Sequence, residues 1–116
     1  MNRGRGGVEH EDLILGEGPS AEPGCVVNVR YDLLLNRGEK VQEDQTCSFR
    51  LGGRRVIPGL EYGVEGMRVG GKRRLRVGPH LGYRDEGIPG VVPVNAVLEF
   101  HVTLMGVSSD EVSGGA

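Results

Sequence analysis

Apolar and polar residues alternate along most of the chain, which is the pattern of β-strands with one buried face. In residues 26–36, VVNVRYDLLLN, the shared face carries Val27, Val29, Tyr31, Leu33 and Leu35. In residues 96–107, AVLEFHVTLMGV, it carries Ala96, Leu98, Phe100, Val102 and Leu104. Both segments therefore predict antiparallel strands that cover a core on one side.

Three further segments predict shorter strands. They are EDLILGEG at residues 11–18, CSFRLGG at residues 47–53 and KRRLRVG at residues 72–78. The stretch NRGEK at residues 36–40 has the polar and glycine residues that are typical of a hairpin turn. The sequence therefore predicts four or five antiparallel strands.

A short helix is predicted between the strands. Leu60, Val64 and Met67 fall at positions i, i+4 and i+7, which form one face of a helix about two turns long. Pro58 precedes them and suits a first helical turn, where no N–H is needed. Residues 78–95 hold too many Gly and Pro residues for either element and predict a long loop, which is usually functional in a compact domain. Helix and strands together predict an α+β domain.

One domain accounts for the 116 residues. Residues 1–8 predict a flexible segment rich in Gly and Arg, residues 9–107 the domain, and the small, polar residues 108–116 a disordered tail. The net charge of −2 indicates no general attraction to nucleic acid or membranes. Neither a secretory signal nor a membrane-spanning run is recognisable, so the sequence predicts a cytoplasmic protein.

Two stretches partly match binding motifs without meeting their requirements. GMRVGGK at residues 66–72 fits a phosphate-binding loop, but Arg73 stands where Ser or Thr is needed, and the predicted helix precedes the loop instead of following it. The basic residues between Arg68 and Arg76 have no interleaved aromatic residues, which favours a solvated strand face over nucleic-acid binding. Histidines and cysteines lack the spacing of metal ligands, and neither a cofactor nor a catalytic triad is predicted.

A family resemblance appears in a set of motifs. They are VIPGL at residues 56–60, GVEGMRVGGKR at residues 63–73, a tyrosine at position 83 and PVNAVLEF at residues 93–100. With this spacing the chain resembles the FKBP-type peptidyl-prolyl cis/trans isomerases from about Gly24 to Val107, and more weakly from His10. The resemblance implies a twisted antiparallel β-sheet half-wrapped around one short helix, with a pocket between helix and sheet.

The resemblance also implies which residues form the pocket. Catalytic roles fall to Tyr83, Ile57 and Phe100. The implied substrate-binding positions are Tyr31, Val41, Gln42, Cys47, Val56, Leu60, Ile88 and Val92. Leu60 would form the floor beneath the substrate proline, and the Ile57 backbone N–H or the Tyr83 hydroxyl would hold the substrate carbonyl.

Such a pocket suits rotation about an X–Pro bond, a reaction that needs no nucleophile, metal or cofactor. The barrier is about 18–20 kcal/mol because amide resonance is broken in the twisted form. An apolar pocket disfavours the charge-separated planar amide and can bind the twisted form selectively. An acceleration of about 10⁴-fold requires only about 5.5 kcal/mol of differential binding.

Four pocket positions lack the residue that is usual in the family: Leu60 in place of Trp, Val41 and Cys47 in place of aromatic residues, and Gln42 in place of Asp. Compared with the family, the segment from Gly38 to Phe49 is about two residues short, so Asp44 could take the place of the missing acid. Ile88 stands where one branch of the family has His. These departures predict weaker binding of macrolide inhibitors and leave room for reduced activity.

The sequence thus predicts a monomeric peptidyl-prolyl isomerase that acts on X–Pro bonds in unfolded or flexible polypeptides. The alternative is an FKBP-like module that binds a peptide or protein partner with weak or no turnover. Docking of nucleic acid on the basic strand face is a third and weaker hypothesis. Turnover that depends on Tyr83 or Phe100 would distinguish the enzyme from the module.

Overall fold

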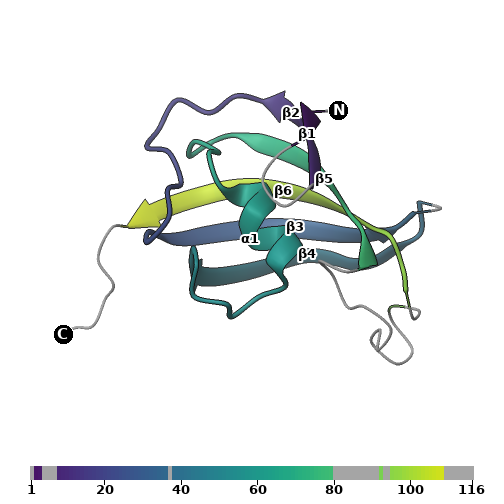
Figure 1. Ribbon diagram of the computed structural model, residues 1–116. Coiled ribbons are helices and arrows are strands. Elements are labelled where there is room, and N and C mark those ends of the chain that lie inside the picture. Colours follow the sequence, from purple (N-terminus) through teal and green to yellow (C-terminus); the bar gives the residue numbers. More distant parts are fainter. Residues whose placement is uncertain (1, 4–7, 37, 80–91, 93–94, 109–116) are drawn as a thin grey trace.

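A computed structural model describes residues 2–3, 8–36, 38–79, 92 and 95–108. They form a six-stranded sheet with the order β1-β2-β5-β6-β3-β4, in which all neighbouring strands are antiparallel. The strands are β1 (Asn2–Arg3), β2 (Glu9–Ile14), β3 (Val26–Leu35), β4 (Lys40–Arg50), β5 (Lys72–Val77) and β6 (Leu98–Ser108). The described part of the chain has one helix, α1 (Pro58–Val64), which lies across one face of the curved sheet (Figure 1). The α+β class predicted from the sequence is confirmed.

The alternation in the sequence becomes a single core between the sheet and α1. The two long central strands are adjacent, and their register pairs Leu33 of β3 with Phe100 of β6. The buried apolar residues of the strands are Val27, Val29, Leu33, Leu35, Phe49, Leu75, Val77, Leu98, Phe100, Val102 and Leu104. On the helical side, Leu60 and Val64 are buried on one face of α1, as predicted. Met67 is also buried, but the helix ends at Val64, so the predicted extension of the helix to Met67 is wrong.

The N-terminal residues contribute more to the domain than the sequence suggested. Asn2–Arg3 pair with the first two residues of β2. Val8, which the sequence assigned to a flexible segment, is only 2% exposed and belongs to the core. The core therefore begins one residue before the predicted domain boundary. Residues 4–7, most of the predicted loop at 78–95 and the end of the predicted tail lie outside the described residues.

The segment that partly matches a phosphate-binding loop is a turn between α1 and β5. Gly66 and Gly70 have φ values of 91° and 92°, which favour glycine because other residues are strained there. The Gly70 N–H donates to the carbonyl of Leu104 at 3.0 Å, which ties the turn to the sheet. Because a strand follows the turn, the phosphate-loop interpretation remains excluded.

Arg73 corrects the prediction of a solvated basic face. Its side chain points inward with Leu75, and the residue is only 7% exposed. Its Nε donates to Oδ1 of Asp12 at 2.7 Å. Its Nη1 donates to the carbonyls of Gly63 and Glu65, at 2.9 and 3.1 Å, where α1 ends. Arg73 therefore satisfies helix-end carbonyls that have no partner within the helix.

A close approach of α1 to the sheet sets the position of the helix. A Cβ built on Gly63 would collide with the Cδ atoms of Leu75. We therefore expect Gly63→Ala to lower the free energy of unfolding by about 1 kcal/mol, because overpacking outweighs the better helix propensity of alanine. Urea denaturation measures the change. Gly106→Ala is the control, since nothing lies within 4 Å of its Cβ; a stabilised Gly63→Ala protein would contradict the close approach.

On the outer sheet face, Glu99 makes stability depend on pH. Its carboxylate accepts a hydrogen bond from Arg74 Nε at 2.8 Å and lies 2.7 Å from His101 Nε2. Partial burial by itself raises the pKa of Glu99, but the hydrogen bonds and charges of Arg74 and His101 outweigh it and hold the pKa below its ordinary value of 4.5. The folded state therefore binds fewer protons at Glu99 than the unfolded state between its lowered pKa and 4.5.

We expect Glu99→Gln to lower the free energy of unfolding at neutral pH. The difference from the parent should persist above pH 4.5 and shrink as the pH falls through the lowered pKa of Glu99. Urea denaturation of both proteins across this range gives the measurement. A difference that stays constant down to the lowest pH would show that the charge of Glu99 does not matter.

Candidate active site

The site is built where α1 begins. Ile57 immediately precedes the helix with an extended backbone, at φ −60° and ψ 145°, which the following proline favours. Its carbonyl accepts the N–H groups of Leu60 and Glu61 at 3.1 and 3.4 Å. Its own N–H has no hydrogen-bond acceptor among the described residues, and the residue is only half-buried. A backbone donor is therefore open at the start of α1.

A cavity of about 410 Å³, which we call the substrate cavity, lies beside this donor. Its described lining consists of Tyr31, Arg54, Arg55, Val56, Ile57, Leu60 and Phe100. The structure therefore brings together five residues that the sequence placed in the pocket, from β3, β6, α1 and the segment before it. The roles that the resemblance implied for these five residues stay predictions.

Two aromatic rings shape one wall of the substrate cavity. The ring centroids of Tyr31 and Phe100 are 5.5 Å apart and the ring planes meet at 62°, an edge-to-face arrangement. Phe100 is 1% exposed and Leu60 is 3% exposed. Deep burial holds both side chains in place, so the cavity has a rigid apolar end.

Six predicted pocket residues are not seen in the lining of this cavity, for two different reasons. Val41, Gln42, Cys47 and Val92 are described but are not part of the lining, and Tyr83 and Ile88 lie outside the described residues. Burial raises the pKa of the Cys47 thiol, which keeps it neutral and suits an apolar filler. The roles of these six residues in substrate binding stay predictions.

Gln42 shares the inner face of the sheet with Leu33, its partner in the register. Its Oε1 atom is buried and has no hydrogen-bond partner among the described residues. Buried polar atoms normally have partners, so Gln42 is an exception within the described part of the chain. The position that carries an acid in the family therefore still presents an oxygen.

Asp44 does not take the place of the missing acid. Between Tyr31 and Leu33 the register of β3 and β4 shifts, and Asp44 adopts a positive φ of 57° at this bulge. Its N–H donates to Asp32 Oδ1 at 2.7 Å, and its carboxylate pairs with Arg30 Nε at 3.0 Å. The Asp44 side chain is 67% exposed, so the bulge directs it to solvent.

Arg54 and Arg55 are lining residues that the sequence reasoning missed. They directly precede the VIPGL motif, and this adjacency was the available signal. Arg54 has a positive φ of 61°, and its N–H donates to Oε2 of Glu61 at 2.9 Å. Arg54 and Arg55 make the described lining of the cavity basic, because it contains no carboxylate.

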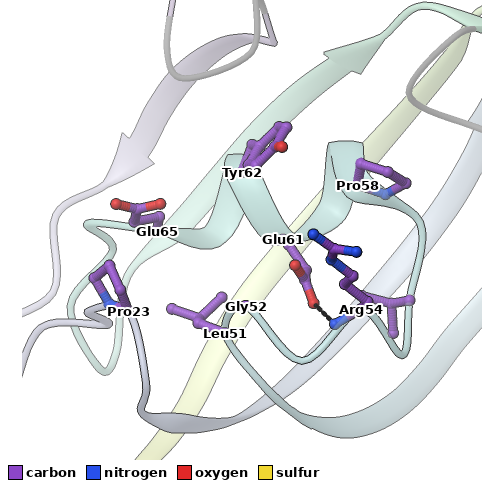
Figure 2. Close-up of a pocket in the computed structure, with 9 residues that line it drawn as sticks. Pro23, Leu51, Gly52, Arg54, Pro58, Glu61, Tyr62 and Glu65 are labelled. Carbon is purple, nitrogen blue, oxygen red and sulfur yellow. Dashed lines mark hydrogen bonds between the residues drawn. The ribbon is translucent and has the colours of Figure 1, made fainter.

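A second cavity of about 510 Å³, the helix cavity, adjoins the first (Figure 2). Its lining consists of Pro23, Leu51, Gly52, Arg54, Val56, Pro58, Glu61, Tyr62 and Glu65. Arg54 and Val56 line both cavities, so the two are neighbours across the segment that leads into α1. Nothing in the sequence pattern indicated the helix cavity.

Comparisons with known proteins agree with this geometry. Residues 18–105 match the family described as FKBP-type peptidyl-prolyl cis-trans isomerase. The 46 kDa FK506-binding nuclear protein of Spodoptera frugiperda is 42% identical over 106 residues, which cover 88% of this chain and 26% of that protein. Peptidyl-prolyl cis-trans isomerase FKBP53 of Arabidopsis thaliana is 40% identical over 107 residues, covering 87% and 22%. The chain thus spans about a quarter of the length of these curated relatives.

Solved structures show the same fold. The crystal structure of a peptidyl-prolyl cis-trans isomerase from Pseudomonas syringae has a TM-score of 0.80 at 30% identity, covering 92% of this chain and 80% of that one. The crystal structure of AtFKBP13 has a TM-score of 0.79 at 29% identity, covering 89% and 94%. The arrangement of α1 on the sheet is therefore a shared feature.

Proposed function

Because the chain belongs to the FKBP-type peptidyl-prolyl cis-trans isomerase family, we propose that it accelerates rotation about X–Pro bonds in polypeptide substrates. The observation that carries this proposal is the apolar substrate cavity beside the open Ile57 N–H. A proline ring would enter over Leu60, and the carbonyl before it would accept the hydrogen bond from Ile57. Tyr83 remains the predicted second donor.

The cavity supplies the two effects that the reaction needs. Its aromatic and aliphatic walls exclude water, which disfavours the charge-separated planar amide relative to the twisted one. A donor that fixes the carbonyl leaves the proline side free to rotate, so the twisted state can be bound more tightly than either planar state. No covalent bond changes, and the lining residues act by shape and solvation.

A short Leu-Pro peptide tests the proposal. We expect its cis-to-trans relaxation to accelerate in proportion to the concentration of the protein, because uncatalysed rotation takes tens to hundreds of seconds. Exchange spectroscopy or a protease-coupled assay gives the rate. A folded protein that leaves the uncatalysed rate unchanged would overturn the isomerase proposal and favour a binding module instead.

The partner and compartment are parts of the same proposal. Substrates are proline-containing polypeptides, and macrolide inhibitors would bind weakly because Leu60 and Gln42 depart from the family pattern. The protein would act as a monomer in the cytoplasm, although the Spodoptera frugiperda relative is named a nuclear protein. In the described residues, no helix is long and apolar enough to cross a membrane. Light scattering and microscopy of a tagged protein test these points.

A further inference from the structure

The proposed isomerisation step does not use the helix cavity, which is larger than the substrate cavity. Figure 2 shows Glu61 on α1, Glu65 directly after the end of the helix, and Pro23 and Leu51 on the neighbouring segments. It adjoins the substrate cavity through Arg54, which lines both. A peptide that holds its proline over Leu60 can therefore continue toward this second hollow.

A buried carboxylate defines the chemistry of the helix cavity. Glu61 is only 8% exposed and lines the cavity. Its Oε2 accepts the N–H of Arg54, while no hydrogen bond to Oε1 is formed within the described residues (Figure 2). Buried carboxylates are normally satisfied by several donors or by a paired charge, so Glu61 retains capacity for a cationic donor.

The other lining residues suit the stem of a long basic side chain. Glu65, the residue that directly follows α1, supplies a second carboxylate. Pro23, Leu51 and Tyr62 supply apolar surface. Lysine and arginine bury their methylene stems along apolar surface while the charged group reaches a polar partner. An acidic side chain would be repelled by the two carboxylates, and a purely apolar one would leave Oε1 of Glu61 without a donor.

We propose that the helix cavity is a second substrate subsite, which binds a lysine or arginine side chain of the polypeptide at a short distance from the isomerised proline. The proposal rests on the proposed isomerase function. It also predicts a dependence on position. A basic residue next to the proline would be repelled by Arg54 and Arg55, which line the substrate cavity. In the helix cavity, the two carboxylates outnumber the single guanidinium group of Arg54 and would attract a basic residue.

The test uses peptides with a Leu-Pro core in which one position, two to five residues from the proline on either side, carries Lys or Glu. For at least one position we expect kcat/KM to be about fivefold higher with Lys than with Glu, the size of a partly exposed charge pair. Raising the salt concentration should reduce this ratio, because screening weakens the pair.

Variants assign the preference to the helix cavity. Glu61→Gln keeps an oxygen for the Arg54 N–H and removes the charge, and Glu65→Gln removes the second carboxylate. Combined, they should bring the Lys/Glu ratio to about one. Glu43→Gln is the matched control, since that glutamate is an exposed residue of β4 outside the cavity; it should keep the preference.

The remaining outcomes distinguish a failure of the subsite from a failure of the isomerase activity. Equal rates for Lys and Glu peptides at every position, or a preference that survives Glu61→Gln with Glu65→Gln, would overturn the subsite while leaving the isomerase intact. If no peptide is turned over, the proposed function fails. Fluorescence binding of the same Lys and Glu peptides then decides the subsite alone: tighter binding of Lys supports it, and equal binding overturns it.

Discussion

Replacing Phe100 by leucine should lower kcat/KM for a Leu-Pro peptide about 10- to 100-fold while the protein stays folded. Leucine fills part of the ring volume but removes the flat wall and the edge-to-face contact with Tyr31. Aromatic pairs contribute about 0.5–1.5 kcal/mol beyond buried area, and an ill-fitting group in an apolar pocket costs about 1–3 kcal/mol. Each 1.4 kcal/mol lost from the twisted state corresponds to about tenfold in rate.

A matched control separates the cavity from general loosening of the core. Leu104 is as deeply buried as Phe100, on the same face of β6, but does not line the substrate cavity. Leu104→Val should cost about 1 kcal/mol of stability, similar to other single-methylene deletions, with kcat/KM per folded molecule unchanged. An equal loss of kcat/KM in both variants would indicate general loosening of the core. Full activity of Phe100→Leu would show that this cavity is not the active site.

Replacing Arg73 by leucine should lower the free energy of unfolding by about 3 kcal/mol. The change removes one partner of a largely buried ion pair, which typically costs about 3–5 kcal/mol. The side chain of Asp12 is 26% exposed, so water can solvate its carboxylate once Arg73 is gone. We therefore expect a loss of stability at the lower end of this range. The carbonyls of Gly63 and Glu65 lose their donor as well, so the end of α1 is destabilised.

Arg74 is the control on the same strand. Its side chain is 42% exposed and pairs with Glu99 on the outer face. Arg74→Leu should therefore change the free energy of unfolding by at most about 1 kcal/mol. Urea denaturation of both variants at neutral pH gives the comparison. Similar effects of the two substitutions would contradict the structural role of Arg73 beneath α1.

The strands and the helix could be predicted because their signals are local. A strand with one buried face must alternate, as residues 26–36 and 96–107 do, and a helix that starts at Pro58 must repeat its apolar residues every three or four positions. The family motifs added the pocket residues of α1 and the segment before it. The resemblance alone implied all eleven predicted pocket residues, and five of them line the substrate cavity.

Features that depend on distant partners could not be predicted. Alternation puts Arg73 on the face of Leu75, but its burial is tolerated only because Asp12, 61 positions away, lies within 2.7 Å. Asp44 points to solvent because β4 carries a bulge at that position, which only the pairing of the strands reveals.

By itself, then, the sequence determined the alternating strands and the short helix, because burial on one face leaves a periodic trace in the chain. The family resemblance, not the periodicity, implied the floor of the substrate cavity. Only the tertiary structure decided that Arg54 and Glu61 meet beside the substrate cavity and that a second, acidic hollow adjoins it. A cavity is the space that several elements leave between them, and no single stretch of sequence encodes it.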